Sequence, residues 1–202
     1  MRRSLIPLSR APHPVACPLA ITILLLLPML TPAIWQQALE YQRPTLANRE
    51  LWRLVTGHLV HLGWGHFGMN LLGFLLIWQL FLRPHLTLFS CFFTLILLTI
   101  CTSCGLFLFS PEVAWYRGLS GVLHGWLIWA LLQELRRHPV SSGLLLSLLV
   151  GKLAWEQLLG PVPGSEAVAS GQVIVDAHLY GAIAGALLWG LETYVPRRKK
   201  TR

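Results

Sequence analysis

Charged side chains are scarce in this chain of 202 residues. Only 12% of the residues are charged and eight are acidic, whereas about a quarter of a typical soluble domain is charged. Hydrophobic residues make up 54% of the chain and gather in runs near the ~20 residues that a helix needs to cross a bilayer. The polar stretches between these runs are too short to bury a core of their own. The composition therefore excludes an ordinary soluble domain and predicts one membrane domain over residues 1–202.

The net charge of +8 does not predict a nucleic-acid-binding surface. Much of the positive charge lies near the two ends of the chain, at Arg2, Arg3, Arg10 and residues 197–202. The basic residues lack the interleaved aromatic residues that single-strand binders use. Basic ends beside apolar segments are typical of cytoplasmic anchoring. We therefore expect the lipid bilayer as a partner, and no nucleic acid.

Six apolar segments predict an all-α bundle of six transmembrane helices. They cover approximately residues 15–34, 66–82, 86–109, 119–135, 140–159 and 175–195. No small-residue cleavage site follows the first segment, so we expect it to be a span rather than a signal peptide. Arginines and lysines outside the spans concentrate on one side, which predicts that both termini are cytoplasmic.

The four cysteines fall inside or beside apolar segments, at Cys17, Cys91, Cys101 and Cys104. Cys101 and Cys104 have the spacing of a redox or metal-binding pair, but no second pair accompanies them. We expect all four to be buried side chains that pack between helices.

One serine and one histidine stand in glycine-spaced apolar segments, where polar groups are costly and are candidates for function. Ser120 opens the fourth segment and His178 lies near the start of the sixth, and both are external in the predicted topology. The glycines beside them are Gly118, Gly121, Gly181 and Gly185. Small residues at intervals of four let two helices approach closely. A serine hydroxyl that faces an imidazole can carry out acyl transfer, so the pair predicts a serine hydrolase; the alternative is a serine that only packs or caps a helix.

Neighbouring polar residues extend this candidate site. Asp176 lies two residues before His178, about 200° away around one helix, so we expect a Ser-His dyad without a carboxylate. His66 and Asn70, four residues apart on one helix face, share the predicted depth of Ser120 and can donate hydrogen bonds to an oxyanion. A polar pair that joins helices is the alternative for these two residues.

Lys152 and Glu156 are two further ionisable residues in the fifth segment. Their spacing of four allows a direct ion pair, which lowers the cost of burying both charges. Two roles remain open for them: a structural ion pair, or a gate that shapes the entrance for the substrate.

Several motifs resemble, in order and spacing, those of the rhomboid intramembrane serine proteases over nearly the whole chain. They are Trp52-Arg53, His66-x-x-x-Asn70, Gly118-x-Ser120-Gly121 and Ala177-His178-x-x-Gly181-x-x-x-Gly185. The resemblance implies a nucleophilic Ser120 and a general base His178. It also implies an oxyanion hole formed by His66, Asn70 and the Ser120 amide, with Trp52-Arg53 bracing the first external loop.

A finer resemblance is to the rhombosortases, a bacterial branch of that family. Residues 118–125 carry it, together with Lys152 and Trp155-Glu156-Gln157. It implies an enzyme of the bacterial inner membrane that cuts membrane-anchored proteins before an apolar C-terminal helix preceded by a glycine-rich stretch. His124 stands where many rhomboids have an aromatic residue, so it can stack on His178 or form a hydrogen bond nearby.

Two other functions stay open. An inactive rhomboid-like protein could bind membrane helices without cutting them. A metalloenzyme could hold zinc through histidines, namely His58, His61, His66, His124 and His178, although the H-E-x-x-H motif of zinc proteases is absent. A Ser-His mechanism requires no metal and no organic cofactor, so we expect neither.

Overall fold

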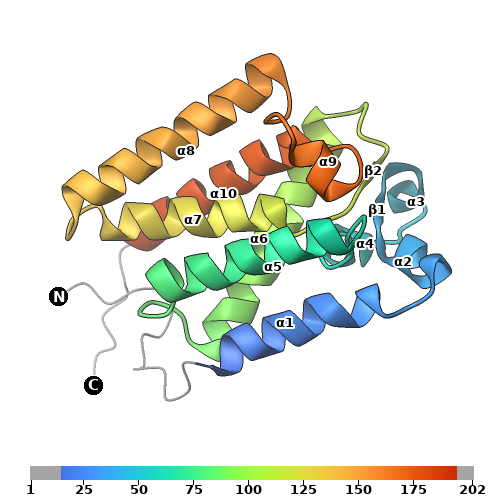
Figure 1. Cartoon of the computed structure of the whole chain (residues 1–202), viewed down its shortest axis with the longest axis horizontal. Coiled ribbons are helices and arrows are strands. Elements are labelled where there is room, and N and C mark those ends of the chain that lie inside the picture. Colours follow the sequence, from blue (N-terminus) through green and yellow to red (C-terminus); the bar gives the residue numbers. More distant parts are fainter. Residues whose placement is uncertain (1–14, 195–202) are drawn as a thin grey trace.

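The structure, a computed structural model, describes residues 15–194. Its long helices run side by side, and the short elements gather at one end of this bundle (Figure 1). The elements are α1 (Ala16–Met29), α2 (Ala33–Leu39), β1 (Tyr41–Gln42), α3 (Arg43–Ala47), α4 (Arg53–Thr56), α5 (Trp64–Ile77) with a π-helical end η1 (Trp78–Leu82), α6 (Leu88–Phe109), β2 (Trp115–Tyr116), α7 (Ser120–Glu134), α8 (Pro139–Leu159), α9 (Ser165–Ala169) and α10 (Val175–Tyr194).

The predicted helical segments match the long helices closely. Five of them agree with α5–η1, α6, α7, α8 and α10 to within two residues at each end. The first was predicted to reach residue 34, but α1 ends at Met29. Thr31 precedes Pro32, a position that disfavours helical backbone, and the chain starts again as α2 at Ala33.

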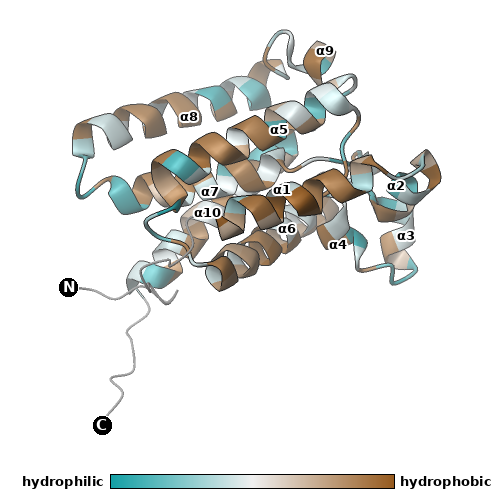
Figure 2. Ribbon diagram, turned by 60° about the horizontal axis from the view of Figure 1, so that its bottom comes forward, coloured by the Kyte–Doolittle hydropathy of each residue, from teal (hydrophilic) through white to brown (hydrophobic). Residues whose placement is uncertain are grey.

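Three helices of the described part of the chain are long and apolar enough to cross a membrane: Trp64–Leu82, Leu88–Phe109 and Pro139–Leu159. Figure 2 shows apolar residues along most of the bundle, with hydrophilic residues in the short elements and turns and on part of α8. The predicted count of six spans and the cytoplasmic termini stay predictions. The basic residues Arg2, Arg3, Arg10 and 197–202 lie outside the described residues.

Helix α7 is enclosed by protein, since none of its residues is exposed. Its backbone lies directly against that of α10: a Cβ added to Gly121 would lie 2.7 Å from the Ala177 carbonyl, and one added to Gly125 would lie 2.7 Å from the Gly181 carbonyl. The predicted close approach through small residues is therefore confirmed.

The cysteines differ from the expectation of four buried packing residues. Cys17 and Cys91 are buried, and a disulfide joins them between α1 and α6. Cys101 is exposed and Cys104 half-buried, so the prediction is wrong for these two. One side of α6 has no neighbouring helix in the described part of the chain, and Cys101 lies on that exposed side.

Candidate active site

Ser120 and His178 meet where α7 and α10 begin. Ser120 is the first residue of α7, and His178 lies in the first turn of α10. The Ser120 Oγ is 2.9 Å from Nε2 of His178, which is 5% exposed. The glycine contacts between these two helices bring the side chains within hydrogen-bonding distance. The predicted serine–histidine pair is thus present as a contact.

A carboxylate contacts the imidazole of this pair. Nδ1 of His178 lies 3.0 Å from Oε2 of Glu156, a buried residue of α8. Asp176 points elsewhere and accepts a hydrogen bond from Ser110 Oγ. The expectation of a dyad without a carboxylate is therefore wrong, although the rejection of Asp176 agrees with the structure. Spacing along one helix excludes Asp176, but it does not reveal a carboxylate that comes from another helix.

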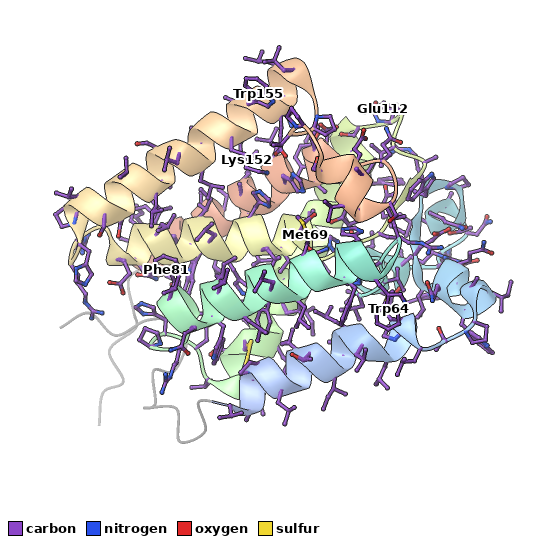
Figure 3. The ribbon with its side chains drawn as sticks, in the orientation of Figure 1. Trp64, Met69, Phe81, Glu112, Lys152 and Trp155 are labelled. Atoms are coloured by element: carbon purple, nitrogen blue, oxygen red, sulfur yellow. A yellow bond between two sulfur atoms is a disulfide. The ribbon has the colours of Figure 1, made fainter. Side chains whose placement is uncertain are left out.

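Lys152 and His124 surround the same carboxylate. The Lys152 Nζ lies 2.8 Å from Glu156 Oε1 and 2.9 Å from Nε2 of His124. The His124 ring stacks on that of His178, with centroids 4.2 Å apart and planes 18° from parallel. Figure 3 shows Lys152 on the side of α8 that faces α10. The Lys152–Glu156 ion pair is confirmed, and it contacts the serine–histidine pair directly.

His66 and Asn70 approach the serine from α5. The backbone N–H of Leu62 donates to Nδ1 of His66 at 3.5 Å, so we assign the proton of this imidazole to Nε2. A Cβ added to Gly118 would lie 2.7 Å from that Nε2 and 3.6 Å from Nδ2 of Asn70. Both nitrogens therefore converge beside the loop that leads into Ser120. Asn70 Nδ2 is buried and has no hydrogen-bond acceptor, so it is free to donate to a bound group.

The loop before Ser120 depends on Gly118 and Tyr116. Gly118 has φ +123°, a conformation that favours glycine, and an added side chain would overlap His66. The Tyr116 hydroxyl donates to the Gly118 carbonyl at 2.5 Å. Burial raises the pKa of Tyr116 to about 12, so this hydroxyl keeps its proton at neutral pH. Sequence reasoning missed Tyr116, because its role depends on the β1–β2 pairing rather than on any motif.

Trp52 and Arg53 tie the short elements together. The buried Arg53 donates to the Glu50 carboxylate at 2.5 Å and to the carbonyls of Gln37 and Glu40 at 2.8 Å each. The Trp52 indole donates to a carbonyl of α2 at 3.3 Å. Such contacts would hold the first external loop in one conformation, as the sequence predicts for Trp52 and Arg53. An ion pair of 2.6 Å between Arg117 and Glu40 adds to the same region.

A cavity of about 340 Å³ opens beside the serine. Its polar lining consists of the residues described above: Ser120, His178, His66, Asn70, His124, Lys152 and Glu156, with Ser165 from α9. The remaining lining is largely apolar and includes Met69, which Figure 3 shows on α5. An apolar chamber with a few convergent polar groups is typical of a ligand or substrate site.

The five histidines of the alternative zinc hypothesis do not gather at one place. His58 bonds Ser103 Oγ at 2.9 Å, and His61 packs on Phe67 and His66. Within residues 15–194, the one group of possible metal ligands is His124, Glu156 and His178, whose ligand atoms lie within 4.8 Å of one another. The ammonium of Lys152 lies 2.8 Å from Glu156 Oε1, 2.9 Å from His124 Nε2 and 3.5 Å from His178 Nδ1. A cation therefore occupies the place where a metal would bind.

A family model described as a Rhomboid domain matches residues 48–193, which include every residue of the candidate site. A comparison with curated proteins gives no match.

Proposed function

Since the chain belongs to the rhomboid family, whose members are intramembrane serine proteases, we propose that it hydrolyses a peptide bond of membrane-attached proteins with Ser120 as nucleophile and His178 as general base. The observation that carries the proposal is the 2.9 Å contact between Ser120 Oγ and His178 Nε2, beside the unpaired Nδ2 of Asn70. A nucleophile, its base and a free donor are the minimum set for acyl transfer.

The first half of the reaction forms an ester. His178 Nε2 takes the Ser120 proton while Oγ attacks the carbonyl carbon of the substrate. The oxyanion accepts hydrogen bonds from Asn70 Nδ2, His66 Nε2 and the Ser120 amide, which has no acceptor within its own helix. The tetrahedral intermediate collapses as His178 gives its proton to the leaving amine. The acyl group then remains bound to Ser120.

The second half restores the enzyme. A water molecule loses a proton to His178 and attacks the ester, and the same donors stabilise the second oxyanion. His178 returns the proton to Ser120 as the carboxylic acid product leaves. The cycle uses only side chains and water, so we propose no metal and no organic cofactor.

The substrate and the setting are also part of the proposal. Rhomboid proteases act on membrane proteins within the bilayer. The largely apolar cavity supports an extended, locally unwound anchor segment as the occupant. With the resemblance to rhombosortases, this favours cleavage before an apolar C-terminal helix that follows a glycine-rich stretch. We propose a six-span enzyme of the bacterial inner membrane, with cytoplasmic termini and its site near the external face.

The test is co-expression with a reporter that ends in a glycine-rich stretch, an apolar helix and basic residues. We expect the wild type to remove the anchor, and Ser120→Ala and His178→Ala to leave it in place. Ser165→Ala is the matched control, because Ser165 lines the same cavity but its hydroxyl bonds, among residues 15–194, only the Val162 carbonyl. Cleavage by Ser120→Ala would refute the serine mechanism. Binding of the reporter without cleavage by the wild type would favour an inactive helix-binding protein.

A further inference from the structure

We infer that Glu156 is the third member of a Ser-His-Glu triad and that Lys152 holds its carboxylate in place. This inference rests on the proposed function, because a positioning residue needs a nucleophile and a base to position. In this assignment Glu156 does not touch the reacting atoms. It acts through His178, by fixing which nitrogen of the imidazole carries the proton.

Each oxygen of the carboxylate has one donor. Oε2 faces His178 Nδ1 at 3.0 Å and Oε1 faces Lys152 Nζ at 2.8 Å. Glu156 is 3% exposed, so water does not compete for these oxygens. An ionised carboxylate can only accept hydrogen bonds. His178 must therefore carry its proton on Nδ1, which leaves a lone pair on Nε2 toward Ser120 Oγ.

The direction of the remaining hydrogen bonds agrees with this assignment. His124 Nδ1 lies 2.7 Å from the Ser120 carbonyl oxygen, an acceptor, so His124 also carries its proton on Nδ1. Its Nε2 then accepts from Lys152, whose ammonium has no lone pair. The contacts of Glu156 and of the Ser120 carbonyl thus agree on Nδ1 as the protonated nitrogen of both imidazoles, and Lys152 Nζ also lies 3.5 Å from His178 Nδ1.

The charges explain why a lysine accompanies the carboxylate. A lone buried carboxylate in a membrane protein is costly, and the ammonium at 2.8 Å offsets that cost. When His178 takes the serine proton, it becomes a cation between these two groups. Glu156 lies 3.0 Å from its Nδ1 and Lys152 lies 3.5 Å from it, so attraction exceeds repulsion. The pair therefore favours the proton-accepting state while remaining neutral as a whole.

Neutral replacement of Glu156 gives a distinctive expectation. In Glu156→Gln, the ammonium of Lys152 attracts the amide oxygen and the NH₂ group turns toward His178. The imidazole must then place its proton on Nε2, where it cannot accept from serine. In the double variant Lys152→Met/Glu156→Gln, no ammonium competes, and the amide oxygen can again accept from His178 Nδ1. The double variant should therefore be more reactive than the single one.

The experiment measures the rate at which a small fluorophosphonate labels purified protein in detergent. We expect Glu156→Gln to lower this rate roughly a thousandfold, since the wrong imidazole tautomer in a serine triad costs up to about 10⁴-fold. We expect the double variant to be labelled at least about tenfold faster than Glu156→Gln. For cleavage of a reporter by Glu156→Gln, we expect kcat to fall while KM stays within about twofold of the wild type. Gln157→Ala, the exposed neighbour on α8, is the control and should label like the wild type.

The outcomes separate the inference from the proposed function. Absence of labelling in the wild type would refute the proposed function itself. A normally labelled wild type with Glu156→Gln within threefold of it would refute the triad alone. So would a double variant no faster than the single one, which is the result expected of a substrate gate.

A measurement on the unmodified protein avoids any folding defect of the variants. The ¹⁵N NMR spectrum of wild-type protein with labelled histidines reports which ring nitrogen of each histidine is protonated. The His178 signals are assigned by their loss in His178→Gln. We expect the proton on Nδ1, and a proton on Nε2 would overturn the inference.

Discussion

A methyl group added to the backbone contact between α7 and α10 should separate the nucleophile from its base. In Gly125→Ala the new Cβ would lie 2.7 Å from the Gly181 carbonyl and 3.0 Å from Leu98 Cδ2, whereas ordinary contacts begin at 3.4 Å. The helices must therefore move apart by several tenths of an ångström. Ser120 lies five residues before Gly125 and His178 three before Gly181, so the shift reaches both side chains.

The cost of this change divides between stability and catalysis. Overpacking of a tight contact costs about 1–3 kcal/mol, and replacing a helical glycine with alanine returns about 1 kcal/mol. We thus expect a net loss of up to about 2 kcal/mol in the free energy of unfolding. A displacement approaching 1 Å costs about a hundredfold in rate, so we expect a drop of 10- to 100-fold in kcat.

Reporter cleavage in detergent, normalised to folded protein, and thermal unfolding measure the two parts of this prediction. Gly190→Ala on α10 is the matched control, because its added Cβ meets nothing within 4 Å. The control should keep full activity and equal or higher stability. Wild-type cleavage and stability in Gly125→Ala would show that the α7–α10 spacing does not set the Ser-His distance.

Three further predictions concern the hydrogen-bond donor Asn70, the protonation of His58 and His61, and the effect of chelators. Asn70→Ala should lower kcat about 10²- to 10³-fold with little change in melting temperature, since its Nδ2 has no partner in the free enzyme; an equal loss from a defect in folding would contradict this. Burial lowers the pKa of His58 and of His61 to about 3, so the unfolded chain binds more protons than the folded one below pH 6.5. Stability should therefore fall by up to about 1.4 kcal/mol per histidine and pH unit as the pH drops from 6.5 toward 3, and replacing both with glutamine should flatten the melting temperature between pH 7.5 and 5.5 relative to wild type. Chelators should leave cleavage unchanged, because Lys152 already supplies the cation beside Glu156; inactivation that zinc reverses would restore the metal hypothesis.

The helices were predictable because each apolar segment is a local property of the chain. Segment length and hydropathy located α5–η1, α6, α7, α8 and α10 to within two residues. Glycine spacing also predicted that α7 and α10 approach closely. The end of α1 was predicted wrongly because the apolar run continues to residue 34, whereas the helix ends at Met29. Pro32 disfavours helical backbone at the residue before it, and this local effect does not show in the hydropathy.

The third residue of the site was not predictable in the same way. The spacing between Lys152 and Glu156 shows that they can pair, but nothing local relates α8 to α10. Glu156 reaches His178 only because both helices pack around α7, which is a property of the whole bundle. Likewise, the unpaired state of Asn70 Nδ2 and the tautomer of His66 depend on neighbours that no motif contains.

The length of α7 has a consequence for how water takes part. Its 15 residues rise only about 22 Å, against a hydrocarbon core of about 30 Å. In the proposed six-span arrangement, one end of α7 can reach the cytoplasmic surface only if the other stops short of the external one. Ser120, at that other end, then lies submerged below the lipid headgroups. Hydrolysis there would require water to reach Ser120 from the external side, and the same seclusion would protect the acyl-enzyme until another nucleophile attacks it.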